Sequence, residues 1–375
     1  MCDTFCSVDA DATLFAKNSD RPPDEVQVVE LHPRRSAVSS ARPMQYIEVA
    51  DRPAHAVMLS RPTWLVGAEH GVNEHGVAVG NERVYSLVED RAPALLGMDL
   101  VRLVLERAAT ADEGLAVLTG LLAGHGQGGS GVADHDDPYD SSFLVVDPQG
   151  GWVIETSGSD WVAQRVVGSA AISNRYGIGM AGDRAGGRAS TATDTTAWHD
   201  PSVDTRIADH RLAATTRCAT ARPTVADAVA VLRDHGGSAE PPSRVGPDRS
   251  GVTVCMHIRD FQATTASMVA TLGAGDTPIR TWVCLGSPCV GVYLPVRFGA
   301  VPAGLSDPSR WHRAAGRRRQ VEADGAALAP LRQVLDPLEV ELWQEADVAH
   351  AATDDPAVHL ALAERSLARI DAATG

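Results

Sequence analysis

The residue at position 2 carries the most chemistry in this sequence. Small second residues favour removal of the initiator Met, and that removal would make Cys2 the amino-terminal residue. Such a residue holds a nucleophile and a base together, because its thiol can pass a proton to its own α-amine, whose ordinary pKa is about 7.7 to 8.0. Cys2 is therefore a candidate nucleophile. The alternative interpretation is a tail cysteine without a role.

A second polar segment lies one hairpin further along the chain, at Phe15-Ala-Lys-Asn-Ser-Asp-Arg-Pro22. A hairpin of that length brings Lys17 and Asp20 back beside residue 2. Asp20 can accept hydrogen bonds from the α-amine, and Lys17 can lower the pKa of the thiol. Lys17 is the only lysine among the 33 basic residues, and a Lys differs from an Arg because its pKa moves on burial. The alternatives are a solvated loop with a local ion pair, and a lysine retained by chance.

The elements that would position these residues follow from hydrophobic patterning. Four short β-strands are predicted at 13–17, 45–49, 55–60 and 76–85. Helices are predicted at 94–108, 110–122, 204–216 and 224–234, the second opening on a capping box at Thr110–Glu113. A β-meander is predicted over 142–174 and irregular chain over 180–200, followed by strands at 264–271, 280–285 and 290–295. Residues 308–375 have helical periodicity and almost no strand signal.

Composition bounds the function. The chain has 375 residues, 44% of them hydrophobic, with 33 basic and 48 acidic residues and a formal charge of −15. So acidic a balance argues against nucleic acid or anionic membranes as partners, because both require a basic footprint. No apolar run reaches the roughly 18 to 20 residues of a membrane span, and no secretory signal is visible at the start. We therefore expect a cytoplasmic protein.

Two further motifs have simple interpretations. Gly124-His-Gly-Gln-Gly-Gly129 matches a dinucleotide-binding fingerprint in its letters, but it follows a predicted helix where that fingerprint follows a strand, which favours a flexible loop. The six cysteines are scattered and lack the spacing of zinc knuckles, so neither a disulfide framework nor a metal site is expected. No cofactor is predicted.

Several motifs, in the same order along about residues 2–295, resemble the secernin family, which belongs with bacterial dipeptidases of the N-terminal-nucleophile (Ntn) hydrolases. They are Cys2-Asp-Thr-Phe, the polar segment at 15–22 followed by Asp24-Glu-Val-Gln27, Ser60-Arg-Pro-Thr-Trp-Leu-Val-Gly-Ala-Glu69, Asn73-Glu-His-Gly-Val-Ala-Val-Gly-Asn-Glu82, Leu95-Leu-Gly-Met-Asp-Leu-Val-Arg-Leu103, Gly126-Gln-Gly-Gly129 and Thr264-Thr-Ala-Ser-Met-Val269.

This resemblance implies an α+β fold, a four-layer α-β-β-α sandwich of antiparallel sheets, over residues 1–300. A helical C-terminal extension would occupy 301–375. The implied catalytic residues are Cys2 as nucleophile, Lys17 and Asp20 beside it, Asn174 and Asn81 as oxyanion donors, and Arg206 as a late pocket residue. An Asn in a turn after Gly80 and an Asn closing a strand end are the simpler interpretations of the two amides.

The implied activity is cleavage of a dipeptide or another small N-acyl amide through a thioester on Cys2. Two alternatives remain open. One is an acyltransferase or peptide-tailoring enzyme that gives the thioester to an amine. The other is a non-catalytic secernin-like scaffold that binds through its sandwich and helices. The Leu-rich C-terminal helices would suit the interface of a homo-oligomer.

Overall fold

The computed structural model describes residues 1–87, 92–242, 245–273, 275 and 277–374. Its strands form two large antiparallel sheets and one small hairpin. The first sheet has the order β12 (Ser169–Ile172), β1 (Cys2–Val8), β2 (Ala12–Arg21), β15 (Gln262–Gly273), β16 (Arg280–Leu285) and β17 (Leu294–Arg297), with β14 (His257–Ile258) paired to β15.

The second sheet runs from one end of the meander to an early strand of the chain. Its order is β13 (Arg184–Gly186), β11 (Asp160–Val166), β10 (Gly150–Ser157), β9 (Asp140–Asp147), β8 (Ala78–Val84), β7 (His70–Asn73), β6 (Val57–Pro62) and β3 (Gln27–His32). The hairpin consists of β4 (Ala41–Pro43) and β5 (Glu48–Ala50).

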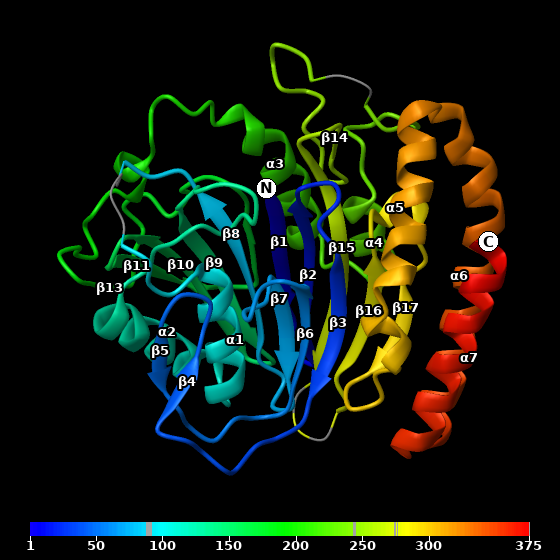
Figure 1. The fold of residues 1–375 in the computed structure, drawn as a ribbon, viewed down its shortest axis with the longest axis horizontal. Helices are drawn as coiled ribbons and strands as arrows, with labels where there is room; N and C mark the ends of the chain where they lie inside the picture. Colours follow the sequence, from blue (N-terminus) through cyan, green and yellow to red (C-terminus); the bar gives the residue numbers. More distant parts are fainter. Residues whose placement is uncertain (88–91, 243–244, 274, 276, 375) are drawn as a thin grey trace.

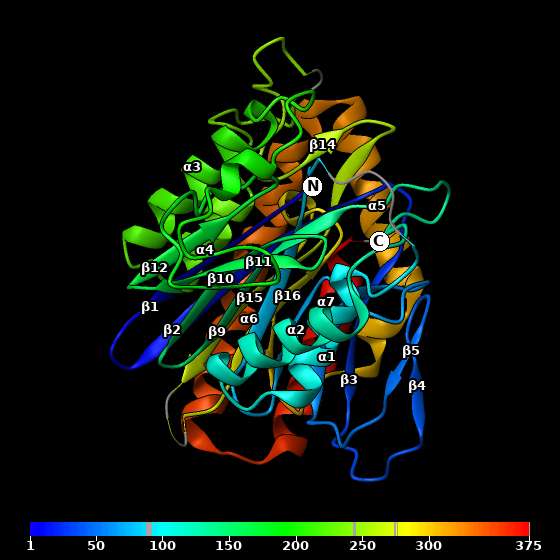
Figure 2. The same ribbon diagram turned by 90° about the vertical axis from the view of Figure 1, so that its left-hand side faces the viewer.

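Three apolar layers hold these sheets and helices together. The strands alternate inward and outward side chains, so each sheet presents two packing faces. Side chains such as Phe15, Val72 and Met268 fill the space between the sheets. The outer face of the second sheet packs on α1 (Gly97–Arg107) and α2 (Ala111–His125). The outer face of the first packs on α3 (Arg206–Thr220) and α4 (Val225–Leu232). The predicted α-β-β-α sandwich of antiparallel sheets is therefore confirmed (Figures 1 and 2).

The C-terminal region is helical, as predicted, up to Thr374, while Gly375 lies outside the described residues. It comprises α5 (Pro308–Ala323), α6 (Leu328–Ala352) and α7 (Pro356–Thr374), which lie along one side of the molecule (Figure 1). These helices contact the sandwich through polar groups as well as apolar ones. Trp311 Nε1 donates to the carbonyl of Thr265 at 2.9 Å. Glu339 binds the Arg233 guanidinium at 2.7 and 2.9 Å and accepts from the main-chain N–H of Tyr293 at 2.7 Å.

Sequence and structure differ mainly in the short elements. The strand predicted over 290–295 begins only at Leu294, because Pro288–Val290 form a 3-10 turn, η2. The strand predicted at 45–49 is the three-residue β5, and β3 and β7 were not predicted. The segment 180–200 contains β13 and the 3-10 helix η1 (Thr195–Trp198). Two further 3-10 helices lie in the described C-terminal part, η3 (Ala303–Ser306) and η4 (Gly325–Ala327).

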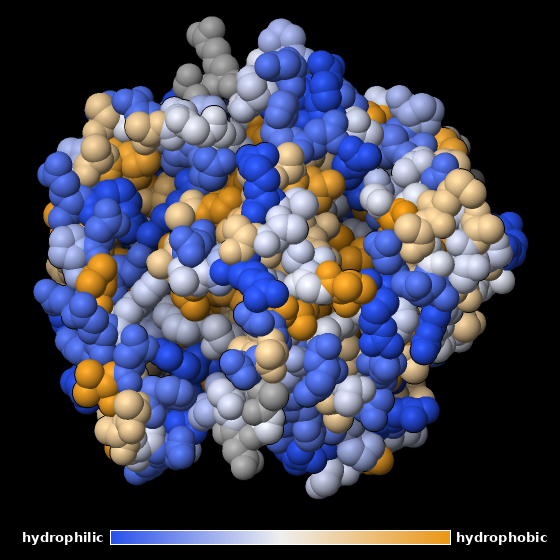
Figure 3. All heavy atoms as spheres, turned by 180° about the vertical axis from the view of Figure 1, so that it is seen from behind, coloured by the Kyte–Doolittle hydropathy of each residue, from blue (hydrophilic) through white to orange (hydrophobic). Residues whose placement is uncertain are grey.

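The prediction of a glycine loop is confirmed, and that of a capping box is confirmed in one half only. The Thr110 side chain caps α2 by accepting from the N–H of Glu113 at 3.1 Å, but the Glu113 carboxylate accepts from the N–H of Ala109, at 2.7 Å, and not from that of Thr110. The glycine segment 124–129 follows α2 as a loop: Gly126, with φ 73°, ends the helix, and Gly129 has φ 100°. Among the described residues, no helix combines the length and apolar character of a membrane span. On the face opposite to that of Figure 1, hydrophobic residues form separate groups among hydrophilic ones (Figure 3).

Candidate active site

Cys2 is the first residue of β1, and the β1–β2 hairpin sets its neighbours. Cys2 lies opposite Ser19 in the antiparallel register, and Thr4 lies opposite Lys17. The hairpin therefore brings the polar segment back to residue 2, as predicted. Cys2 is 5% exposed and lines a cavity of about 700 Å³. Met1 lines the same cavity.

The Cys2 thiol has polar neighbours on two sides. The main-chain N–H of Asp20 donates to Sγ at 3.3 Å, and a carboxylate oxygen of Glu69 lies 3.6 Å from Sγ. Burial raises the pKa of the Cys2 thiol to about 12, although Lys17 and the amino terminus act to lower it. With Met1 in place the thiol is thus protonated near neutral pH, and attack on a carbonyl requires a base that removes its proton.

Lys17 lies fully buried behind the nucleophile. Its Nζ donates to the Asn81 carbonyl at 2.7 Å and to Glu82 Oε1 at 3.0 Å. Burial alone would lower the pKa of Lys17, but the acidic groups of Cys2, Glu82 and Glu69 together raise it. Burial in turn raises the pKa of Glu82 to about 7 against the opposing effect of Lys17. Lys17 is therefore a fixed positive charge that favours a thiolate on Cys2.

Asp20 is held by a hydroxyl and a guanidinium. Its Oδ1 accepts from the Thr264 hydroxyl at 2.6 Å, and its Oδ2 lies 3.7 Å from Arg211. The β15 strand has a bulge between Thr264 and Ala266, opposite Asp20 and Ser19, and such a bulge re-aims a side chain. Burial raises the pKa of Asp20 to about 7, against the lowering effects of the amino terminus and Arg211.

Asn174 and Arg211 fix the backbone of the nucleophile. The main-chain N–H of Cys2 donates to Asn174 Oδ1 at 2.8 Å, and Arg211 donates to the same oxygen at 2.7 Å. Arg211 also donates to the Cys2 carbonyl at 3.1 Å and to Asp3 Oδ2 at 2.7 Å. Nδ2 of Asn174 donates to the Arg83 carbonyl at 2.9 Å, and an amide nitrogen has a second hydrogen to offer.

Arg206, the pocket arginine expected from the sequence, is not placed at Cys2. It is the first residue of α3, is exposed and pairs with Asp204 at 2.7 Å. The inward-facing arginine of α3 is Arg211, whose side chain is fully buried. Five residues along a helix correspond to a rotation of about 140°, so the two arginines point to different sides. The α3 arginine that contacts the nucleophile is therefore Arg211, although the cavity itself is lined by Arg21 and Arg83.

Asn81, on β8, lines the same cavity as Cys2. Its Nδ2 contacts Ser141 Oγ at 3.3 Å and Met98 Sδ at 3.7 Å, and its Oδ1 is buried without a hydrogen-bond partner in the described part of the chain. Helix α1 begins close to the Asn81 side chain, and this requires a glycine at position 97, where a Cβ would lie 2.7 Å from Asn81 Nδ2. Asn81 is thus near the nucleophile, and its role as an oxyanion donor stays a prediction.

Met1 lies at the same cavity, ahead of Cys2. Its ammonium group donates to the Asp20 carbonyl at 3.0 Å and to Gln262 Oε1 at 2.6 Å, and the residue is 7% exposed. Burial lowers the pKa of this terminal amine. While Met1 is present, the nitrogen of Cys2 is an amide and cannot serve as a base.

Sequence reasoning missed Glu69 and Arg211. The buried positions of α3 are Ala208, Arg211, Ala214, Thr215 and Ala219. Since their spacing of three and four residues marks one helix face, it could have shown that Arg211 points inward and Arg206 outward. Glu69 ends one of the motifs that carry the family resemblance, but its position beside Sγ depends on the meeting of the two sheets, which sequence spacing does not show.

No protein-family model matches the sequence. Among solved structures, the chain is similar to the C2A mutant of the conjugated bile acid hydrolase from Clostridium perfringens, with 12% identity, a TM-score of 0.43, and coverage of 75% of this chain and 88% of that one. It is similar to the penicillin V acylase from Agrobacterium tumefaciens, with 12% identity, a TM-score of 0.41, and coverage of 82% and 88%. For the Caenorhabditis elegans orthologue of N-acylethanolamine-hydrolyzing acid amidase, the values are 13%, 0.40, 73% and 94%.

Proposed function

We propose that this chain is a cysteine amidohydrolase whose nucleophile is Cys2, freed as the amino-terminal residue by removal of Met1. One observation carries the proposal: the nitrogen and the sulfur of Cys2 are each held by a defined partner beside a cavity. The nitrogen is bound by Asn174 at 2.8 Å, and the sulfur accepts from Asp20 at 3.3 Å. The motifs that resemble secernins and dipeptidases support the same reaction.

The reaction would run in two steps. The α-amine takes the thiol proton, Sγ bonds to the substrate carbonyl carbon, and the C–N bond breaks as the α-ammonium gives its proton to the leaving amine. Water then adds to the thioester while the α-amine takes its proton, and the C–S bond breaks to release the acid. Asn174 holds the α-amine, Lys17 stabilises the thiolate, and Asn81 with the second N–H of Asn174 would donate to the oxyanion.

Glu69 supports a dipeptide as the substrate. The α-nitrogen of a dipeptide lies only about 2.5 Å from the carbonyl carbon that is attacked. Because a carboxylate oxygen of Glu69 lies 3.6 Å from Sγ, it can pair with the ammonium group of a substrate whose carbonyl contacts the sulfur. An N-acyl amide has no such charge, so Glu69 would favour unblocked dipeptides.

The first test is mass spectrometry of the purified chain together with turnover of a dipeptide and N-acyl amide panel. We expect loss of Met1, hydrolysis of unblocked dipeptides, and an acyl group trapped on Cys2 in rapidly quenched samples. Cys2→Ala should abolish turnover, whereas Cys6→Ala, four residues along β1 and buried between the sheets, should retain it. Full activity in Cys2→Ala, or in a chain that keeps Met1, would refute the nucleophile.

A second test concerns specificity. Glu69→Gln should raise KM for an unblocked dipeptide and leave KM for its N-acetylated form unchanged, since only the first carries an ammonium group. An equal change in both would refute the role of Glu69. Addition of a competing amine distinguishes hydrolysis from acyl transfer: a dominant free acid product supports the hydrolase, and a dominant amide product rejects it.

A further inference from the structure

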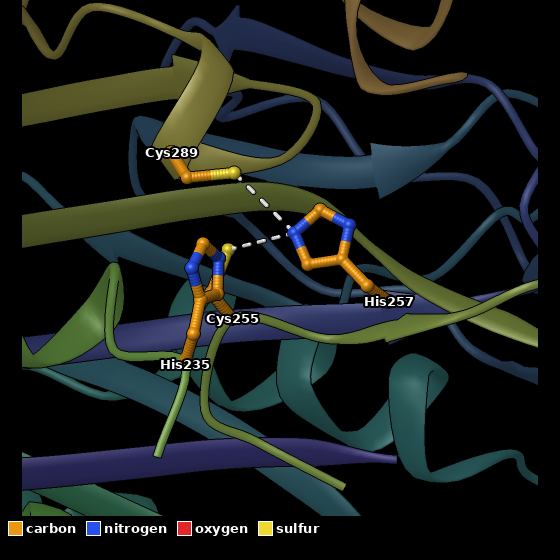
Figure 4. Close-up of side chains that lie close together, drawn as sticks. All are labelled: His235, Cys255, His257 and Cys289. Carbon is orange, nitrogen blue, oxygen red and sulfur yellow. Dashed lines mark hydrogen bonds between the residues drawn. The ribbon is translucent and has the colours of Figure 1, made fainter. Parts of the chain in front are cut away.

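Four side chains with metal-ligating atoms meet beside β14, which pairs with β15 in the sheet that carries Cys2, and the sequence did not indicate this cluster. They are His235, which follows α4, Cys255 in the loop before β14, His257 in β14, and Cys289 in the turn η2. One ligating atom of each lies within 4.8 Å of the others, and all four residues are buried. Figure 4 shows their side chains converging from these separate segments.

The distances around His257 fit a tetrahedral metal. Its Nε2 lies 3.4 Å from Cys255 Sγ and 3.3 Å from Cys289 Sγ (Figure 4). Bonds of about 2.3 Å to sulfur and 2.0–2.1 Å to nitrogen place the ligand atoms of a tetrahedral zinc site about 3.4–3.8 Å apart. The imidazole and the two sulfurs therefore lie close to the edges of such a tetrahedron before any adjustment.

A carboxylate orients the His257 ring in the manner of a metal ligand. Nδ1 of His257 lies 3.0 Å from Glu322 Oε1, on α5, so Nδ1 carries the hydrogen and the lone pair of Nε2 points towards the sulfurs. Metal-bound histidines are commonly held by a carboxylate in this way. Nε2 of His235, a residue only 6% exposed, is buried without a hydrogen-bond partner among the residues that the structure describes.

The surroundings favour a structural site over a second nucleophile. Cys255 is 0% and Cys289 3% exposed, and both pack among apolar side chains that include Val290, Val321 and Leu328. Neither sulfur lines the cavity at Cys2. Two thiolates would neutralise the charge of a divalent cation, so the complete site adds no net charge to an apolar interior.

We infer that His235, Cys255, His257 and Cys289 bind one zinc ion in a closed four-ligand site. Four protein ligands of the Cys2His2 type leave no open position for catalysis, so the ion is structural. Binding would convert two thiols into thiolates and release two protons to solvent. The ion would tie α4, the loop before β14, η2 and, through Glu322, α5 to one point.

The proposed zinc site is linked to the nucleophile through Met256, which lies between the ligands Cys255 and His257 in the sequence. The main-chain N–H of Met256 donates to the Thr264 hydroxyl at 2.8 Å, and that hydroxyl donates to Asp20 Oδ1 at 2.6 Å. The side chain of Met256 packs beside Met1. A zinc ion that fixes the loop would therefore also fix the hydrogen-bond donor of Asp20.

Elemental analysis of the untagged, reduced full-length chain tests the site. We expect about one zinc per chain, and less than about a fifth of that in Cys289→Ser and His257→Gln, because each removes one of four ligands. Cys284→Ser removes a buried thiol that is not a ligand and should keep its zinc. Another metal in stoichiometric amount, or zinc that persists in both ligand variants, would overturn the assignment.

Cobalt titration keeps the test valid if the variants fail to fold. After removal of metal by a chelator, the wild-type chain should bind one Co²⁺ with thiolate-to-cobalt absorption bands and release about two protons. Glu322→Gln should keep the bands but lower the affinity by about 10–100-fold. Absence of the bands in the folded, reduced wild-type chain would refute the site.

Discussion

Replacement of Arg211 by Gln should separate the buried arginine of the active site from its exposed neighbour Arg206. In Arg211→Gln the guanidinium no longer contacts Asp3, the Cys2 carbonyl or Asn174, which it binds at 2.7–3.1 Å. Removing one partner of a fully buried ion pair costs about 3–5 kcal/mol, because the other charge stays buried. Arg206→Gln, at a fully exposed position, should leave the free energy of unfolding nearly unchanged.

The free energy of unfolding, measured in urea, gives the first comparison. In Arg211→Gln the pKa values of Asp3 and Asp20, which burial already raises, should rise further, because the arginine that lowered them is absent. A carboxyl whose pKa is higher in the folded chain than in the unfolded chain destabilises the fold increasingly as pH rises. The deficit relative to wild type should therefore be larger at pH 8 than at pH 5.

Activity gives the second comparison. Since Arg211 holds Asn174 and the Cys2 carbonyl without touching the sulfur, Arg211→Gln should lower kcat by about 10²-fold through misplacement of the nucleophile. Arg211→Lys, which keeps the charge, should recover part of the stability. If Arg211→Gln is as stable and as active as Arg206→Gln at both pH values, the buried network does not position Cys2 and the reasoning fails.

Three further substitutions probe other parts of the structure. Gly80→Ala places a Cβ 2.7 Å from the Cδ of Lys17, so we expect kcat to fall by about 10²-fold; an unchanged kcat and KM would show that the position of Lys17 does not matter. The folded pKa of Asp20, about 7, exceeds the unfolded value by about 3 units, so ionisation of this carboxyl should destabilise the wild-type chain by at most about 4 kcal/mol between about pH 4 and pH 7. In Asp20→Asn this loss of stability should be absent. Equal dependence of the free energy of unfolding on pH in the two proteins, measured in urea, would contradict this. Asn73→Ala removes the donor to two carbonyls at the end of α1, at 2.9 and 2.7 Å, and should cost about 1–3 kcal/mol in thermal or urea unfolding with kcat unchanged; a selective loss of kcat would contradict a purely structural role.

The parts of the site that the sequence predicted are close in the chain or carried by motifs. Cys2, Lys17 and Asp20 belong to one hairpin, whose pairing follows from the period of two in a strand. The proximity of these three residues can therefore be predicted without knowing the rest of the fold. Asn174 was predicted only through the family resemblance. The sequence alone does not determine where the meander that ends at Asn174 lies relative to β1.

The missed parts depend on contacts between distant segments. To predict Arg211, the buried face of α3 must be identified from the sequence. The fully buried apolar residues of that helix are alanines, whereas Ile207 and Leu212 are only half-buried, so the hydrophobic pattern marks the face weakly. The cluster of His235, Cys255, His257 and Cys289 joins four segments that lack the ligand spacing of a zinc knuckle, and only the packing of β14 and η2 brings them together. Short elements such as β3 and β7 were missed because tertiary pairing, more than local propensity, makes them strands.

The contacts of Glu339 and Trp311 have a consequence for any shortened version of this protein. A fragment that stops at residue 300 would leave the Arg233 guanidinium and the Tyr293 N–H without their carboxylate, and the Thr265 carbonyl without its indole. It would also lack Glu322, the orienting group of His257. Such a fragment should aggregate on expression, because these buried polar groups would lose their partners. A soluble, folded fragment would show instead that the last three helices are dispensable.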